Sequence, residues 1–152
     1  MCGIFGILNN SYIIYENDIE KNFQKGKFRG PDNSILYEID KFNKIGFHRL
    51  AINGLNESSN QPFFFNNIIL ICNGEIYNFK NLFDTLKVKP FSNSDCEVII
   101  HLYVKYGIEQ TLRMLDGVFA FIIYDNRELQ DPKLVVGRDP YGVRPLYKTY
   151  SK

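Results

Sequence analysis

The amino-acid sequence predicts one mixed α+β domain that is rich in strands. Short apolar runs recur along the 152 residues, and turn-forming Gly, Asn and Pro residues separate them, which is typical of hairpins. Helical periodicity is confined to a few segments. Because helices and strands do not alternate regularly, a parallel sheet built from βαβ units is not expected.

The first half of the chain is expected to form mainly strands. A buried apolar strand at 2–8 is followed by a short helix at 18–27, with Ile19 and Phe23 on one face. Gly30 and Pro31 interrupt this helix. The remaining elements are a strand pair at 34–39 and 44–49, a loop at 53–62, and strands at 63–65 and 68–72 that are joined by a turn at 66–67.

The second half carries the longer helices and the strongest strand. A helix is expected at 78–86, and another begins at Ser94, where Ser94-x-x-Glu97 has the pattern of a capping box. Gly107 is well placed to end that helix, and a short helix at 108–115 follows. Strands are then expected at 118–124, 134–137 and 143–147, with a turn at 139–142.

Composition excludes several classes of function. The net charge of +1 and the absence of a basic arm predict neither a nucleic-acid nor a membrane partner. No run is long and apolar enough to cross a bilayer, and the N-terminus lacks a secretion signal. Three cysteines without CxxC spacing and two histidines predict no disulfide framework and no metal site. A reducing, cytoplasmic setting is therefore expected.

Cys2 is a candidate nucleophile because of its position. One interpretation is a small apolar residue in a buried strand, which is common for free cysteine. The alternative is that removal of Met1 leaves Cys2 with a free α-amine whose pKa is about 7.7–8.0. Such an amine can take the thiol proton at neutral pH, so one residue would supply both nucleophile and base.

Asn73 and Gly74 also have two interpretations. Asn-Gly between 68–72 and 75–77 is a strong hairpin signal, since both residues tolerate positive φ. Alternatively, the Asn73 amide and the Gly74 backbone N–H are two donors suited to a developing oxyanion.

Arg49 and Asp95 complete a set of groups suited to an amino-acid amide. Each has an ordinary explanation, Arg49 as a solvated cation at a strand end and Asp95 as a first-turn acid of a helix. Arg49 could instead hold a substrate carboxylate through its planar fork, and Asp95 could hold an α-ammonium group. With Cys2 and the two oxyanion donors, they would provide a nucleophile, an oxyanion hole and two clamps.

Several motifs in order along the chain resemble the class II glutamine amidotransferase domain of the N-terminal-nucleophile hydrolases. They are Met1-Cys2-Gly3-Ile4-Phe5-Gly6, Arg29-Gly30-Pro31-Asp32, His48-Arg49-Leu50, Asn73-Gly74-Glu75-Ile76-Tyr77-Asn78 and Ser94-Asp95-Cys96-Glu97. The runs 115–121 and 137–146 are most similar to the glutaminase domain of glutamine-hydrolysing asparagine synthetase. The resemblance implies a four-layer αββα sandwich.

The resemblance also implies a role for each motif residue in hydrolysing L-glutamine to L-glutamate and ammonia. Cys2 forms the γ-glutamyl thioester, and Asn73 and Gly74 form the oxyanion hole. The remaining residues bind glutamine: Arg49, Leu50, Ala51, Ile52 and Asn53, then Glu75 in the turn beside the oxyanion hole, and Asp95 at the substrate ammonium. Arg138, Asp139 and Arg144 are interpreted as structural, with contact to a synthetase domain as the alternative. Cys72 and Cys96 are interpreted as packing residues beside the site.

In asparagine synthetases, the ammonia passes to a second domain in which ATP activates aspartate. The Ser-Gly-Gly-x-Asp-Ser loop of that domain does not occur in these 152 residues. The sequence is therefore interpreted as a single domain over 1–152 that needs no cofactor for glutamine hydrolysis. ATP and Mg²⁺ would serve only an absent synthetase domain, and a synthetase domain or partner chain is expected to accept the ammonia.

The sequence is also compatible with two alternative functions. The chain stops soon after Tyr147, before the last strands expected of the domain, which favours a catalytically weak remnant that acts as a binding or regulatory module. Another branch of the class II amidotransferases would share Cys2 and the Asn-Gly pair. Against the remnant, each motif residue of the glutamine site is present.

Overall fold

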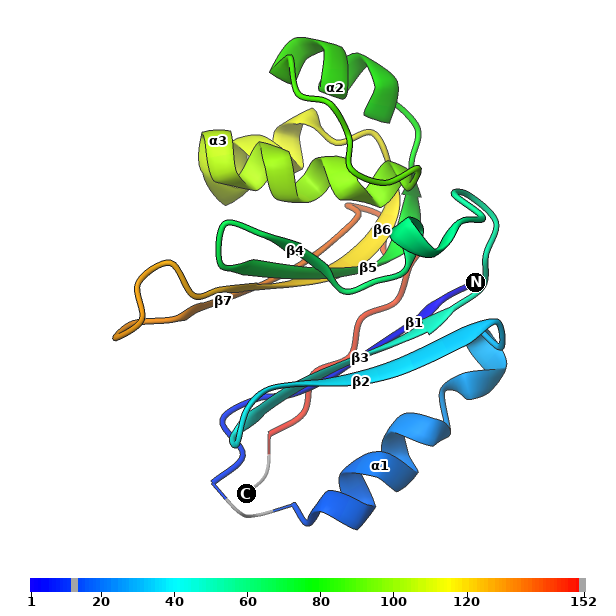
Figure 1. Cartoon of the computed structure of the whole chain (residues 1–152), viewed down its shortest axis with the longest axis vertical. Helices are drawn as coiled ribbons and strands as arrows, with labels where there is room; N and C mark the ends of the chain where they lie inside the picture. Colours follow the sequence, from blue (N-terminus) through cyan, green and yellow to red (C-terminus); the bar gives the residue numbers. More distant parts are fainter. Residues whose placement is uncertain (12–13, 151–152) are drawn as a thin grey trace.

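The computed structural model describes residues 1–11 and 14–150 and shows two antiparallel sheets that face each other (Figure 1). The first has the order β1-β3-β2, and the second has the order β4-β5-β6-β7. Their strands are β1 (Gly3–Ile7), β2 (Asn33–Asp40), β3 (Asn43–Arg49), β4 (Phe63–Phe65), β5 (Ile68–Ile76), β6 (Gly117–Asp125) and β7 (Lys133–Arg138).

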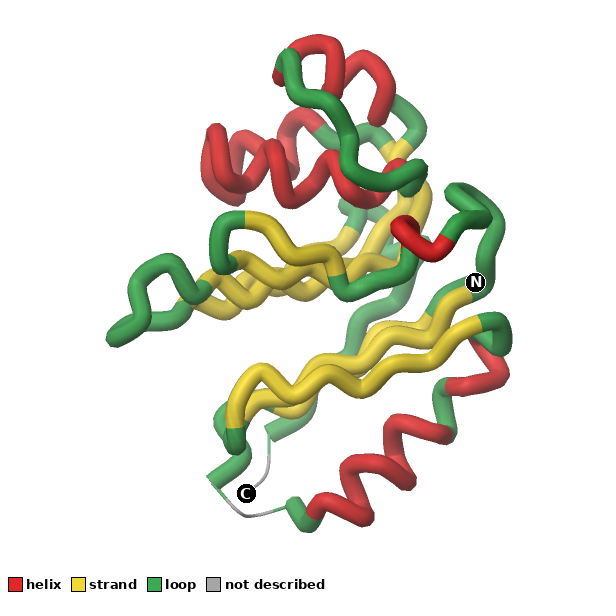
Figure 2. The backbone as a smooth tube through the Cα atoms, in the orientation of Figure 1, coloured by secondary structure: helices red, strands yellow, loops and turns green. Residues whose placement is uncertain are grey.

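The helices lie on the outer faces of the two sheets, while the strands occupy the middle of the molecule (Figure 2). Helix α1 (Glu16–Gln24) lies outside the three-stranded sheet. Helices α2 (Phe79–Leu86) and α3 (Val98–Met114) cover the four-stranded sheet. Short 3-10 turns, η1 (Lys27–Arg29), η2 (Glu57–Ser59) and η3 (Asp95–Glu97), connect these elements. The fold is therefore mixed α/β with two antiparallel sheets, as predicted at the level of fold class.

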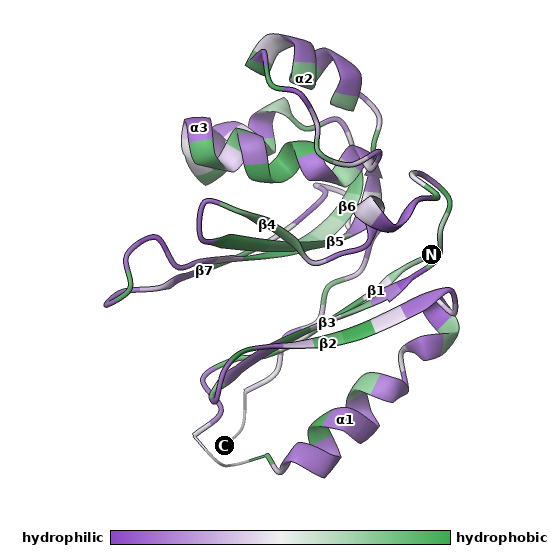
Figure 3. Ribbon diagram, in the orientation of Figure 1, coloured by the Kyte–Doolittle hydropathy of each residue, from purple (hydrophilic) through white to green (hydrophobic). Residues whose placement is uncertain are grey.

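Strands β5 and β6 are apolar on both faces because each face packs against another layer (Figure 3). Successive side chains of a strand point to opposite faces. Leu70 and Cys72 therefore contact the helices, whereas Ile69 and Ile71 contact the other sheet. This two-sided burial explains why residues 68–72 read as a continuous apolar run rather than an alternating one.

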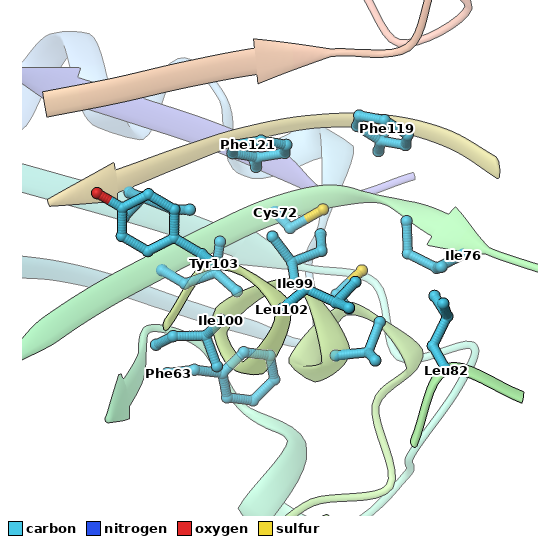
Figure 4. Packing of buried hydrophobic residues seen from close by; sticks show 14 of the residues in the cluster. Phe63, Cys72, Ile76, Leu82, Ile99, Ile100, Leu102, Tyr103, Phe119 and Phe121 are labelled. Atoms are coloured by element: carbon cyan, nitrogen blue, oxygen red, sulfur yellow. The ribbon is translucent and has the colours of Figure 1, made fainter. Parts of the chain in front are cut away.

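The larger core lies between the four-stranded sheet and helices α2 and α3 (Figure 4). Helix α3 contributes Ile99 and Leu102, both fully buried, and β6 contributes Phe119 and Phe121, whose rings stack 5.8 Å apart. Full burial of such side chains stabilises the fold by about 1.5–3 kcal/mol each. The core thus fixes β5 and β6 as the rigid centre of the molecule.

The hairpin interpretation of Asn73-Gly74 is wrong. Strand β5 continues through both residues, with Asn73 opposite Ala120 and Gly74 opposite Phe119 in β6. The turn lies instead at Asn66 and Asn67, where φ is 50° and 58°. Pairing with the long strand β6 overrides the local turn preference, because a continuous ladder satisfies more backbone groups than a hairpin at that point would.

The predicted capping box is also wrong. The Ser94 side chain makes no capping hydrogen bond, and the chain passes through the 3-10 turn η3 before α3 begins at Val98. Glu97 is fully buried, and its carboxylate accepts hydrogen bonds from the backbone N–H groups of residues 91 and 92 instead of from the Ser94 N–H. A buried carboxylate needs several donors, and that requirement outweighs one cap.

Other boundaries differ by smaller amounts. Helix α1 begins two residues before the predicted start and ends at Gln24, because residues 27–29 form η1. Gly107 does interrupt α3, with φ 74° and ψ 176°. The predicted strand at 143–147 is not formed. The N–H groups of Val143 and Arg144 donate to the Asp139 carboxylate, so they are not available to a neighbouring strand.

Among residues 1–11 and 14–150, no helix is long and apolar enough to span a membrane.

Candidate active site

A pocket forms where the start of β1, the end of β3, the exposed edge of β5 and η3 meet. Its lining contains nine of the ten predicted site residues. These are Cys2, Arg49, Leu50, Ile52, Asn53, Asn73, Gly74, Glu75 and Asp95. Residues from four parts of the sequence therefore converge on one cavity, as the resemblance implied. The exception is Ala51, which does not line it and whose N–H donates to the Asp32 carboxylate at 2.8 Å.

The edge of β5 is open beside this pocket because β4 pairs only with residues 68–70. Side chains replace the missing strand at alternate residues. Gln61 donates to the Cys72 carbonyl and accepts from its N–H, and the Asp95 carboxylate accepts from the Ile76 N–H at 2.6 Å. Backbone groups two residues apart point to the same edge, so the Gly74 N–H also points away from β6.

Gly74 presents its N–H at this edge, and the Asn73 side-chain amide is a second donor in the lining of the pocket. No hydrogen bond joins the Asn73 side chain to any other described residue, although the residue is only 6% exposed. A Cβ atom on Gly74 would lie 2.5 Å from the Val118 carbonyl oxygen, so the strand pairing itself requires glycine. The alternation of β5 directs the Asn73 side chain to the same face as Ile71, and Cys2 packs against the cluster on that face.

Cys2 lies half-buried between the two sheets, at the N-terminal end of β1. Its thiol contacts both the N–H and the carbonyl group of Leu50. The Leu50 N–H donates to the Cys2 sulfur at 3.4 Å, and the sulfur lies 3.6 Å from the Leu50 carbonyl oxygen. Burial raises the pKa of the Cys2 thiol above its ordinary value, although the Leu50 N–H, the N-terminal charge and Arg49 oppose this. A base is therefore needed to ionise the thiol at neutral pH.

Arg49 is a buried cation held by neutral acceptors. One guanidinium nitrogen donates to the Asn60 side chain and to the Asn56 carbonyl at 3.3 Å, and the other donates to the Gly54 carbonyl. These bonds anchor the loop that follows β3, yet they leave other N–H groups of the guanidinium for a ligand. No carboxylate in the described part of the chain forms a salt bridge with Arg49.

Asp95 is the matching buried anion. It is 4% exposed and accepts from the Ile76 N–H, with the Asn53 amide further away at 3.5 Å. Among the described residues, no Lys or Arg forms a salt bridge with it. Buried charges in proteins are ordinarily paired, so Arg49 and Asp95 leave one positive and one negative position open in the same pocket.

The structure adds pocket residues that the motifs did not assign. They are Met1, Phe47, Ser59, Gln61, Cys72, Ser94, Cys96 and Arg144. Cys72 and Cys96 lie beside the site, as expected, and a hydrogen bond with the Cys72 thiol, followed by burial, raises the pKa of Cys96. Gln61 supports β5 from a loop, and nothing in its local sequence marks that role. No cluster of three or more His, Cys, Asp or Glu side chains suited to a metal ion occurs among the described residues.

A family model described as the glutamine amidotransferase domain matches residues 1–152. The chain belongs to this family. The amidotransferase domain is 37% identical over 158 residues to a glutamine-hydrolysing asparagine synthetase from Mesocricetus auratus, and 39% identical over 157 residues to the one from Gallus gallus. A protein of Acanthamoeba polyphaga mimivirus named a probable asparagine synthetase is 43% identical over 128 residues, or 81% of this chain.

The amidotransferase domain matches only part of each relative. The alignments cover 100% and 99% of this chain but 27% of the two animal enzymes, and 22% of the viral protein. The similarity therefore concerns the glutaminase part of those proteins.

Proposed function

We propose that this domain hydrolyses L-glutamine to L-glutamate and ammonia, with Cys2 as nucleophile after removal of Met1. The observation that carries the proposal is the presence of two opposite, unpaired charges in the pocket. Arg49 and Asp95 are buried, opposite in charge and without charged partners among the described residues, and both share the pocket with the Cys2 thiol. An amino acid with a free carboxylate and a free ammonium group supplies one partner to each.

The chain supplies the remaining groups for acyl transfer. The Cys2 thiol gives its proton to the Cys2 α-amine, and the thiolate attacks the side-chain amide carbon of glutamine. The Asn73 amide and the Gly74 N–H stabilise the oxyanion, and one such donor is worth about 2.7–4 kcal/mol. Collapse of this intermediate breaks the C–N bond, and ammonia leaves with the proton from the amine. Water then hydrolyses the γ-glutamyl thioester to glutamate and regenerates the thiol.

We further propose that the sheets and helices form the four-layer αββα sandwich of N-terminal-nucleophile hydrolases. The placement of α1 and α3 on opposite outer sides of the paired sheets supports this. No cofactor takes part in the proposed hydrolysis. The ammonia is proposed to pass to a synthetase domain or partner chain, as in a glutamine-hydrolysing asparagine synthetase, and ATP and Mg²⁺ would be needed only there.

The proposed setting is the cytoplasm. The three cysteines are free thiols in the structure, which fits a reducing compartment. Such a compartment also protects a nucleophilic thiol from oxidation.

The test is glutamate release by the purified chain, with intact mass used to confirm loss of Met1. Wild-type protein is expected to turn glutamine over, and Cys2→Ala is expected to lose turnover while keeping its melting temperature. A diazoketone analogue of glutamine should label the peptide that begins with Cys2 once, which mass spectrometry would detect. Free glutamine should protect Cys2 from this labelling. Turnover by Cys2→Ala would refute the assignment of the nucleophile.

The second candidate function, a binding or regulatory module, is favoured by exposed apolar side chains on and after β7. They are Leu134, Val136, Tyr141, Val143, Tyr147 and Tyr150. Such a surface is typical of contact with another domain or chain. Glutamine binding by a folded, Met1-free chain that shows neither turnover nor labelling would favour this function.

A further inference from the structure

Arg144 reaches the active site through a turn that Asp139 organises. The Asp139 carboxylate is 1% exposed and accepts from the backbone N–H groups of Val143 at 2.9 Å, Arg144 at 3.0 Å and Phe119 at 3.3 Å. Burial opposes ionisation of Asp139, but these hydrogen bonds outweigh it and hold its pKa below the ordinary value. The ionised carboxylate therefore fixes the backbone of Arg144 near the start of β6.

The side chain of Arg144 has no partner that would explain a purely structural role. Its Nε is the one buried side-chain nitrogen or oxygen without a hydrogen bond in the described part of the chain. Its Nη1 lies 2.7 Å from the Met1 sulfur, and no carboxylate among the described residues forms a salt bridge with it. A thioether is a weak acceptor, so the guanidinium gains little from this contact.

The proposed function requires that Met1 be removed, and the present inference rests on that function. Loss of Met1 takes away the hydrogen-bond partner that the guanidinium has among the described residues, and it exposes a new amine on Cys2. Five bonds separate the Met1 sulfur from the Cys2 nitrogen, so Nη1 lies within about 9 Å of that nitrogen. Arg144 and Cys2 also line the same pocket.

The other charged groups around Cys2 come from four further elements. Arg29 of η1 donates to the Cys2 carbonyl at 3.1 Å, and Arg49 at the end of β3 lines the pocket. Glu75 of β5 and Asp95 of η3 line it as well, and Asp95 is assigned to the substrate ammonium. Cationic groups therefore predominate at the N-terminus, and Arg144 is the one among them with an unsatisfied buried donor.

We propose that Arg144 is a positioning residue whose positive charge keeps the α-amine of Cys2 in its neutral, proton-accepting form. A nearby cation disfavours a second positive charge, so it lowers the pKa of the amine below about 7.7–8.0. At about 9 Å and an effective dielectric constant between 20 and 80, the shift is roughly 0.3–1.4 pH units. The same charge favours the Cys2 thiolate once the proton has moved.

The first test is the pH dependence of kcat/KM for glutamine hydrolysis. Arg144→Gln removes the charge, so the amine pKa rises and the acidic limb of the profile should move up by roughly 0.3–1.4 units. Activity should fall by roughly two- to ten-fold at pH 7 and recover near pH 9. Arg144→Lys keeps the charge and should restore the wild-type limb. Arg113→Gln on the exposed side of α3 makes the same change in net charge and should leave the profile unmoved.

The second test measures the amine without using catalysis. In the Met1-free Cys2→Ala protein, the α-amine is the sole nucleophile at residue 2, and its acetylation by acetic anhydride can be followed by mass spectrometry across pH. Adding Arg144→Gln should raise the midpoint of this reaction by roughly 0.3–1.4 units. This result supports the role of Arg144 even if wild-type protein releases no glutamate, in which case the proposed function alone fails.

Two outcomes overturn the role. An unchanged acetylation midpoint would show that Arg144 does not act on the amine. A loss of kcat at all pH values that Arg144→Lys fails to restore, with an unmoved acidic limb, would show that Arg144 only holds the fold.

Discussion

Asp95 and Glu97 stand two residues apart at the start of α3, and both carboxylates are buried, yet their surroundings differ. Glu97 accepts from the Ser92 N–H and hydroxyl at 2.6 Å each and from the Phe91 N–H at 2.9 Å, and its Oε1 lies 3.0 Å from His101 Nε2. Asp95 accepts one short hydrogen bond, from the Ile76 N–H, and faces the pocket.

The difference separates a structural charge from one that is available to a ligand. Glu97 is fully satisfied by its own chain, so it fixes the loop at 91–92 onto α3 and has no capacity left for a substrate. Asp95 is held in place by one backbone group and keeps an acceptor free. Burial alone therefore does not identify a functional carboxylate, and what distinguishes Asp95 from Glu97 is how many donors the chain itself supplies to each.

Glu97→Ala should have the largest effect on stability. It would leave the Ser92, Phe91 and His101 donors unpaired inside the protein, so the free energy of unfolding should fall by about 3–5 kcal/mol in urea. Asp95→Asn is the matched control and should change it by less than about 1 kcal/mol. Equal losses from the two variants would remove the distinction between these carboxylates.

Of these two carboxylates, Asp95 should matter more for substrate binding, so Asp95→Asn should have the larger effect on it. The substrate ammonium would lose its buried anion, so kcat/KM for glutamine should fall about 100-fold, mainly through a higher KM. Steady-state glutamate release measures this, and melting temperature verifies the fold. A fall in kcat with an unchanged KM would contradict the proposed role of Asp95.

The pH dependence of stability should sharpen the same contrast. Burial opposes ionisation of Glu97, but hydrogen bonds from His101, Ser92 and Phe91 outweigh it, so its pKa in the folded state is lowered. Its contribution is therefore complete above the unfolded value of about 4.3 and is lost as pH falls through the lower folded value.

The corresponding measurement is urea unfolding of wild-type protein and Glu97→Gln from pH 6 to pH 3. The wild-type free energy of unfolding should fall more steeply than that of the variant below about pH 4.3. Parallel slopes would show that Glu97 does not contribute through its ionised form.

The smallest effect is expected at a third buried carboxylate, which lies away from the pocket. Asp125 accepts from Arg127 and from the Tyr103 hydroxyl at 2.8 Å, and chiefly the Arg127 hydrogen bond holds its pKa at about 2. Tyr103→Phe removes one hydrogen bond and should lower the free energy of unfolding by about 1 kcal/mol. Glutamine hydrolysis should be unchanged, and a marked loss of activity would extend the functional region beyond the pocket.

Much of the fold was predictable from local pattern. The strands at 44–49, 63–65 and 118–124 and the helix break at Gly107 follow from apolar runs and from the conformational freedom of glycine, which act within a few residues. The hairpin at Asn73-Gly74 and the strand at 143–147 failed for a common reason. Their outcome depended on partners distant in sequence, namely β6 in one case and the Asp139 carboxylate in the other.

The candidate site was predictable as a set of residues but not as an arrangement. Every residue that the motifs assigned to the site lines the pocket, with the exception of Ala51. The motifs did not reveal Gln61, nor that Arg144, interpreted as structural, reaches the pocket, because both side chains come from loops. Nor did they show that the Gly74 N–H is available because β4 is too short to cover it.

By itself, the sequence determined the fold class, the family and the chemical groups needed to bind and cleave an amino-acid amide. The tertiary structure decided which of those groups are satisfied within the protein and which remain open. The reason is physical: residue type fixes charge and donor count, whereas the pairing of a buried charge depends on all the chain segments packed around it. Glu97 and Asp95 share a charge and a neighbourhood in sequence, and only the folded chain distinguishes them.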